Sequence, residues 1–166
     1  FSYKEKVLRL EAIAGTEKIG LDMDTFLRSD KNLREHNFVI NYLIENLKSL
    51  DILNFKKGEL MVKEFGNIAH LCTLINVEVN KICPFLLLKR LHPSPAVCGF
   101  PKEKALEYLD SLENFDRGNY ASPFGWVDVE GNADFRVALR GATIVKSNIE
   151  FIAGSGLVKG SIPEKE

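Results

Sequence analysis

Several polar residues stand where they could bind a small anion. Arg140 ends an alternating stretch, residues 135–140, and an arginine at a strand end can donate two parallel hydrogen bonds to a carboxylate. Gly154 and Gly156 flank a serine after another strand-like stretch, and such a turn can point successive backbone N–H groups at an anion. Taken singly, Arg140 is better explained as an ordinary surface charge, and the two glycines as a tight turn.

Carboxylates and a histidine add a second kind of chemistry. Glu35 lies near the apolar stripe of a predicted helix, where its oxygens could bind a hard cation or simply form a solvated flank. His70 lies within a predicted strand and could hydrogen-bond a substrate, although a satisfied core histidine is the commoner case. Glu166 stands at the end of the sequence, where a frayed acidic tail is the ordinary interpretation.

The elements that would position these residues follow from hydrophobic periodicity. The clearest is a helix over 31–50, in which Val39, Leu43 and Leu47 form one apolar stripe that continues to Leu50. A further helix over 103–113 follows Pro101, which suits a helix start because its missing N–H is tolerated there, and it carries a stripe through Ala105, Leu106, Leu109 and Leu112. The remaining predictions are helices over 22–29 and 83–91, and strands over 6–14, 51–55, 59–62, 68–79, 123–129, 135–145 and 149–153, with turns at 56–58 and 131–132.

Grouped helices and consecutive strands favour an α+β fold over an alternating parallel one. The 22 basic and 23 acidic residues nearly cancel, which argues against a nucleic-acid partner. No apolar run approaches the roughly 20 residues of a membrane span, so no membrane partner is expected. The 3 cysteines are odd in number and lack a Cys-x-x-Cys pair. They predict buried thiols in a reducing compartment rather than disulfides or a zinc site.

The order of these residues along the chain is more informative than any one of them. It resembles the catalytic domain of chorismate-utilising enzymes, and of isochorismate synthases in particular. The matching segments are EAIAGT at 11–16, KNLREH at 31–36, HL at 70–71, LHPSPAVCGFP at 91–101, RGNY at 117–120, Arg140, AGSGLV at 153–158 and SIPEKE at 161–166. Anthranilate and aminodeoxychorismate synthases usually carry Gly-Ala-Pro-Lys where this chain has residues 95–101.

The resemblance implies a site for chorismate or isochorismate, with Mg²⁺ as cofactor. It implies that Arg140 and Tyr120 hold a substrate carboxylate, helped by the backbone at Gly154 and Gly156. Thr16, His70 and Ser94 would line the pocket. Glu35 and Glu166 would be the metal ligands.

The resemblance also implies a fold and a domain boundary. The family fold is a layered sandwich of β-sheets with outer helices, and residues 1–166 would be a partial catalytic domain, truncated at both ends. The family's base lysine and acid glutamate lie upstream of the position that matches Phe1. No catalytic acid or base is therefore expected in this chain, which predicts an inactive fragment and possible self-association of its open apolar surface.

Alternatives remain at this point. Salicylate synthases share the glutamates, the arginine and the glycines, so salicylate synthase or another chorismate-converting synthase is the second candidate enzyme. A third possibility is a non-catalytic half that needs a partner chain. The pathway, whether menaquinone, siderophore or salicylate biosynthesis, is not specified by these residues. A cytoplasmic location is expected, or an organellar one if a targeting peptide lies upstream.

Overall fold

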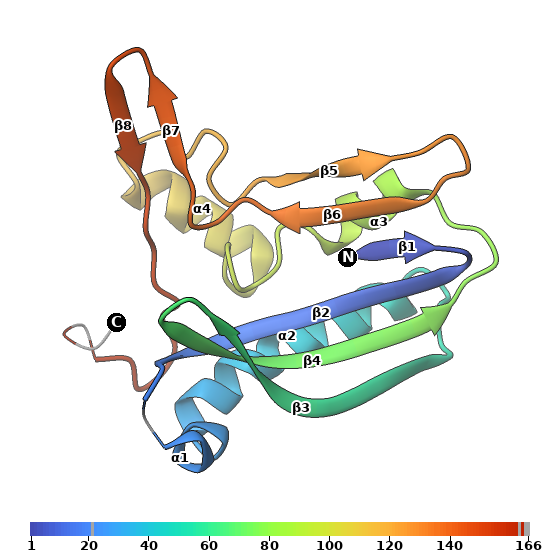
Figure 1. Cartoon of the computed structure of the whole chain (residues 1–166), viewed down its shortest axis with the longest axis horizontal. Coiled ribbons are helices and arrows are strands. Elements are labelled where there is room, and N and C mark those ends of the chain that lie inside the picture. The colour runs from blue at the N-terminus through green and yellow to red at the C-terminus, as the bar shows by residue number, and fades with distance from the viewer. Residues whose placement is uncertain (21, 163, 165–166) are drawn as a thin grey trace.

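The chain forms one large antiparallel sheet with helices, and it carries a separate small hairpin (Figure 1). This computed structural model describes residues 1–20, 22–162 and 164. The large sheet has the strand order β3-β4-β2-β1-β6-β5, and β7 pairs only with β8. The α+β prediction is confirmed. The elements are β1 (Ser2–Lys4), β2 (Val7–Lys18), α1 (Met23–Leu27), α2 (Asp30–Lys48), β3 (Phe55–Phe65), β4 (Ile68–Glu78), α3 (Pro84–Leu91), α4 (Lys102–Leu112), β5 (Pro123–Val127), β6 (Ala133–Val137), β7 (Ala142–Val145) and β8 (Asn148–Phe151).

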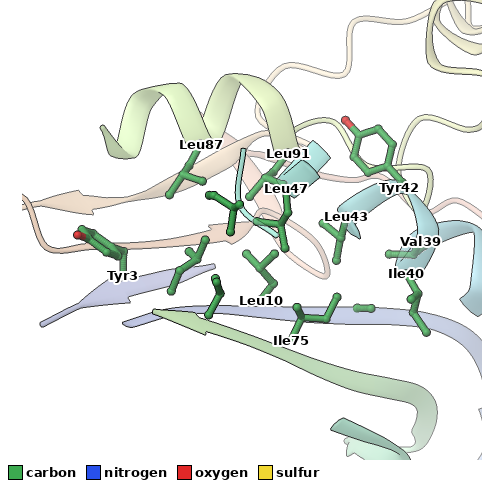
Figure 2. Close-up of a cluster of buried hydrophobic side chains, with 14 of the residues drawn as sticks. Tyr3, Leu10, Val39, Ile40, Tyr42, Leu43, Leu47, Ile75, Leu87 and Leu91 are labelled. Carbon is green, nitrogen blue, oxygen red and sulfur yellow. The ribbon is translucent and has the colours of Figure 1, made fainter. Parts of the chain in front are cut away.

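The core lies between α2 and the strands β2 and β4. The predicted helix stripe is buried there, and α3 adds Leu87 and Leu91 from the side (Figure 2). Ser29 caps the start of α2, where its hydroxyl accepts a hydrogen bond from the Asn32 N–H at 3.4 Å. The cluster consists of Tyr3, Leu8, Leu10, Ala12, Ala14, Val39, Ile40, Tyr42, Leu43, Leu47, Ile52, Ile75, Val77, Leu87 and Leu91.

A bulge in β2 changes which side chains face the helix. The β2–β4 register shifts between Ala14 and Thr16, and Gly15 adopts a positive φ of 77°. Thr73 of β4 faces α2, because its hydroxyl bonds the buried His36 ring. Side chains alternate along a strand, so His70 lies on the opposite face, together with its cross-strand neighbour Thr16. We call this opposite face of β2, β4 and β3 the site face.

Three predictions about the strands are wrong. Residues 55–65 form one strand with a bulge between Lys57 and Leu60, so there is no turn at 56–58. The predicted strand over 51–55 is absent, because the chain first turns at Asp51, which has a positive φ of 58°. Residues 135–145 are also divided between two sheets: β6 ends at Val137 and β7 begins at Ala142. Arg140 lies in the bend between them.

The second predicted helix exists but its stripe is not buried. α4 has no buried residue among those described, and it begins one residue after Pro101, which takes the cap position. The exposed side chains of its predicted stripe include Leu106 and Leu112. The prediction of buried thiols is confirmed for Cys72 and Cys98 but is wrong for Cys83, which is exposed next to α3. In the described part of the chain, no helix is long and apolar enough to cross a membrane.

The buried contact between α2 and the sheet should dominate stability. Leu47 is 0% exposed, so Leu47→Ala leaves a cavity that the rigid helix–sheet interface cannot close. We expect a loss of about 2 to 5 kcal/mol in the free energy of unfolding, measured by urea denaturation followed by circular dichroism. Leu53 is 67% exposed and serves as the control, because Leu53→Ala should change stability by less than about 0.5 kcal/mol. Equal losses in the two variants would contradict this assignment of the core.

Candidate functional site

Thr16, His70 and Arg140 meet on the site face. The His70 Nδ1 atom lies 3.0 Å from the Thr16 hydroxyl and 3.3 Å from the Gly15 carbonyl oxygen. On the other side of the ring, the Arg140 guanidinium contacts Nε2. A carbonyl oxygen only accepts and a guanidinium only donates, so a neutral ring protonated on Nδ1 satisfies both neighbours. His70 is half-buried and fully hydrogen-bonded, and it lies outside the enclosed core.

Electrostatics favour this neutral form of His70. Burial of the ring, together with the nearby Arg140 charge, lowers the pKa of His70 below its usual value. A neutral Nε2 can accept from Arg140, whereas an imidazolium would repel it. The guanidinium has five N–H donors, and the contact with His70 uses one nitrogen. The remaining donors could bind an anionic group.

The backbone bend at Arg140 brings two distant segments together. Arg140 has a positive φ of 55°, which is uncommon for a residue with a side chain. Just before the bend, the Ala138 N–H donates to the Ser122 carbonyl at 2.8 Å, and the Ala138 carbonyl accepts from the Ala121 N–H at 2.8 Å. The alternating sequence predicts that a strand ends at Arg140, whereas the residue lies two positions beyond this last ladder contact. This ladder places the bend beside the turn that carries Tyr120.

Tyr120 is fixed by its own turn and lies close to Gly154. Its N–H donates to the Arg117 carbonyl at 2.8 Å, and the Arg117 guanidinium lies 5.7 Å from the ring centroid. A Cβ atom at Gly154 would lie only 2.9 Å from the Tyr120 hydroxyl. The chain after β8 therefore passes directly over Tyr120, and glycine allows this close approach.

The same segment then reaches Glu35 on α2. A Cβ atom at Gly156 would lie 3.0 Å from the Glu35 Oε1 atom. Further along, the Arg34 guanidinium donates to the Lys159 carbonyl at 3.1 Å and ties the segment to the same helix. One glycine-containing segment thus contacts Tyr120 through Gly154 and Glu35 through Gly156.

Ser94 and Glu166 are not linked to the other predicted site residues by any described interaction. Ser94 lies in the loop after α3, where its carbonyl accepts from the Val97 and Cys98 N–H groups, both at 3.1 Å. The Tyr42 hydroxyl holds this loop on α2 by donating to the Pro93 carbonyl at 3.1 Å. Glu166 lies outside the described residues.

Of the two predicted metal ligands, Glu35 is the one that the structure describes. No group of three or more His, Cys, Asp or Glu side chains converges among the described residues. Mg²⁺ in enzymes commonly uses one or two protein carboxylates and completes its shell with water and substrate oxygens. The single carboxylate of Glu35 fits this pattern. The glycine at position 156 leaves space next to its Oε1 atom, which a Cβ atom would approach to 3.0 Å.

Phe65 also lies beside His70 and Arg140, although no sequence motif pointed to it. Phe65 is the last residue of β3, and its ring centroid lies 5.6 Å from that of the His70 ring. The Arg140 Cζ atom lies 5.2 Å from its centroid. An aromatic residue in a strand is ordinarily a core residue, and only its place just before a turn at Gly66 distinguishes it in the sequence.

The described geometry defines an α+β protein with a candidate site for a small anion, supported by one carboxylate that could hold a cation. Comparison with known proteins specifies the class. Residues 1–166 match the family described as chorismate binding enzyme. The chain therefore belongs to the chorismate binding enzyme family.

The relatives of the chain include isochorismate synthases. The salicylate biosynthesis isochorismate synthase of Pseudomonas aeruginosa is 37% identical over 163 residues, which cover 93% of this chain and 34% of that protein. The vibriobactin-specific isochorismate synthase of Vibrio cholerae is 34% identical over 145 residues, which cover 86% of this chain and 36% of that protein. The structure of the menaquinone-specific isochorismate synthase MenF from Escherichia coli matches with a TM-score of 0.86 at 30% identity, covering 99% of this chain and 40% of that one. The chain thus spans well under half the length of each.

His36, the neighbour of Glu35, should make stability depend on pH. It is 1% exposed, and its Nε2 atom lies 2.8 Å from the Thr73 hydroxyl oxygen. Burial, helped by the charge of Lys57, lowers the pKa of His36 from 6.5 to about 4. The folded protein therefore binds fewer protons than the unfolded chain between these values, and stability is lost as the pH falls through this window.

His36→Gln removes this titration while keeping an amide that can bond Thr73. Between pH 7 and pH 4.5, we expect the wild-type chain to lose about 2 kcal/mol more unfolding free energy than the variant. Urea denaturation at the two pH values measures the difference, and other groups titrate alike in both proteins. Parallel losses in the two proteins would show that His36 is not buried in its neutral form.

Proposed function

We propose that this chain forms the carboxylate-binding part of an isochorismate synthase, and that the whole enzyme converts chorismate to isochorismate. The observation that carries the proposal is the meeting of Thr16, His70 and Arg140 on the site face. Membership in the chorismate binding enzyme family supports the same conclusion, as do relatives named isochorismate synthase.

The chemistry of these residues suits the substrate. Chorismate is a small dianion, so its binding requires donors and positive charge to offset the loss of water around two carboxylates. Arg140 supplies both, because the N–H groups not used by His70 can form parallel hydrogen bonds to one carboxylate. Tyr120 adds a hydroxyl donor, and the backbone around Gly154 and Gly156 adds N–H groups. Thr16, His70 and Ser94 would contact the rest of the ligand.

Glu35 and Glu166 would hold Mg²⁺ near the second carboxylate. Bound Mg²⁺ would offset negative charge on the substrate and polarise it for reaction. Glu35 contributes a carboxylate from α2, close enough to Gly156 that ligand, metal and the glycine segment would meet at one place. The residues of this chain would thereby orient the substrate ring and exclude water from one side.

Turnover requires groups beyond this binding surface. In the proposed reaction, water adds at one ring carbon while the hydroxyl at another carbon leaves, which requires a general base and a general acid. The resemblance places both upstream of the position of Phe1. We therefore propose that residues 1–166 bind the ligand without converting it. The parent would be a cytoplasmic enzyme, in line with the free thiols of all the cysteines.

Salicylate synthase is the second candidate, because the resemblance places the same binding residues in both enzymes. One relative carries salicylate biosynthesis in its name, although that protein is itself called an isochorismate synthase. The products of the full-length parent separate the two candidates: isochorismate alone supports the first, and salicylate with pyruvate supports the second.

Chorismate binding by this chain should depend on Arg140. We expect calorimetric titration in the presence of Mg²⁺ to show binding by the wild-type chain. Arg140→Ala should weaken it by about 10- to 100-fold, because a charge-assisted contact is lost. Arg136→Ala is the matched control, since Arg136 is exposed on β6 and pairs with Asp134. Undetectable binding by the wild-type chain, or equal weakening in both variants, would refute the proposed carboxylate site.

The metal dependence should pass through Glu35. Glu35→Gln keeps the size of the side chain but removes its charge, so Mg²⁺ should no longer strengthen chorismate binding. Glu45→Gln, on an exposed position of the same helix, should retain the full effect of the metal. The measurement is the dissociation constant of chorismate as a function of Mg²⁺ concentration. A Mg²⁺ effect that survives Glu35→Gln would remove Glu35 from the metal site.

A further inference from the structure

Two cationic side chains lie near the Phe65 ring. The Arg140 Cζ atom lies 5.2 Å from its ring centroid, and the Lys63 Nζ atom lies 5.5 Å from it. The His70 ring meets the Phe65 ring at an interplanar angle of 60°. The carboxylate site described above uses Arg140 and His70 but leaves this aromatic ring without a role.

The register of the sheet explains why these side chains meet. Lys63 pairs with His70, and His70 pairs with Thr16, so the three form a row across β3, β4 and β2. Phe65 lies two residues after Lys63 and therefore projects from the same face. The chain then turns back at Gly66, which has a positive φ of 62° and leads directly into β4. Phe65 therefore lies at the end of β3, where this strand is still paired with β4.

The two cations are held in different ways. Lys63 forms an ion pair with Glu11, with an N–O distance of 2.6 Å, so its charge is offset within the sheet. Within the described part of the chain, Arg140 has no carboxylate partner, and its contacts are the Phe65 ring and the His70 ring. An aromatic face attracts a guanidinium but accepts no strong hydrogen bond from it. Such a partner can orient Arg140 without neutralising its charge or using up its donors.

We propose that Phe65 is a positioning residue, whose ring holds the Arg140 guanidinium against His70 so that the unused N–H groups face the substrate carboxylate. This inference rests on the proposed function of Arg140. A carboxylate in place of the ring would also hold Arg140, but it would compete with an anionic ligand. An aliphatic side chain would fill space without attracting the cation.

The first test needs no ligand. The charged groups around His70 are Arg140 and, across β3, Lys63 with its partner Glu11. Arg140 lowers the pKa of His70, so release of the guanidinium should raise that pKa. We expect Phe65→Leu to raise the pKa of His70, measured by NMR titration of the ring proton, and Phe65→Tyr to preserve it. Phe65→Met provides a second variant without an aromatic face, in case Phe65→Leu does not fold.

A double variant separates positioning from a general change in burial. Arg140→Ala should raise the pKa of His70 on its own, and Phe65→Leu should add little in that background. Phe124→Leu is the matched control, because Phe124 is 58% exposed on the edge strand β5 and should not affect His70. An unchanged pKa of His70 in both the Leu and Met variants would overturn the inference, as would equal increases with and without Arg140.

The second test measures the consequence for binding. In the presence of Mg²⁺, Phe65→Leu should weaken chorismate binding by about 5- to 30-fold, the range expected for loss of a cation–π contact. Phe65→Tyr keeps an aromatic ring and should bind chorismate as the wild-type chain does. Full-strength binding by Phe65→Leu would overturn the positioning role. If the wild-type chain binds no chorismate, the proposed function itself fails, and the His70 titration then still decides whether Phe65 holds Arg140.

Discussion

The arrangement of the whole site depends on the close packing of β2 against α2 at Gly15. A Cβ atom at this position would lie 3.0 Å from the Asn32 carbonyl oxygen and 3.1 Å from the Asn32 Cβ atom. The backbone there also has a positive φ of 77°, so both space and conformation call for glycine. The bulge moves the chain by one residue, which keeps Ala14 in the core and sends Thr16 to the site face. The Gly15 carbonyl, left outside the regular ladder, then receives the His70 N–H.

The two faces of the sheet consequently carry different chemistry. On the helix side, His36 and Thr73 form a polar pair inside an otherwise apolar interface, and burial keeps the imidazole neutral. On the site face, His70 is also kept neutral by burial and by a nearby cation, here Arg140, which contacts the ring directly. The first histidine lies within the packing that presents Glu35, while the second contacts a guanidinium. Each histidine contacts a threonine of the β2–β4 ladder: His36 contacts Thr73 of β4, and His70 contacts Thr16 of β2.

Much of the framework could be predicted from the sequence, because periodicity reports burial on one side of an element. The helix stripe Val39, Leu43 and Leu47 is buried as expected, and the long strand of residues 68–79 is found as β4. The errors occur where periodicity continues through a change in backbone conformation. Alternation continues past Val137 up to the bend at Arg140, and nothing in the residue types indicates its positive φ. The stripe of α4 is regular, yet the described chain provides no surface to bury it. The Lys56-Lys57-Gly58 sequence has turn composition but is accommodated as a bulge within β3.

The candidate site was harder to predict, because its contacts join residues that are far apart in the chain. Family motifs selected Thr16, His70, Tyr120 and Arg140 individually, but only the antiparallel register shows that Thr16 and His70 are direct neighbours. The role of Phe65 had no sequence signal, since an aromatic residue at a strand end is usually explained by packing. The glycines of the final segment illustrate the same limit. Their spacing suggested an anion-binding turn, whereas the structure adds a steric reason: Gly154 passes Tyr120 and Gly156 passes Glu35. Because one segment contacts both side chains, its course is limited by the tyrosine and the carboxylate together. Glycine backbone is therefore what these two parts of the candidate site share.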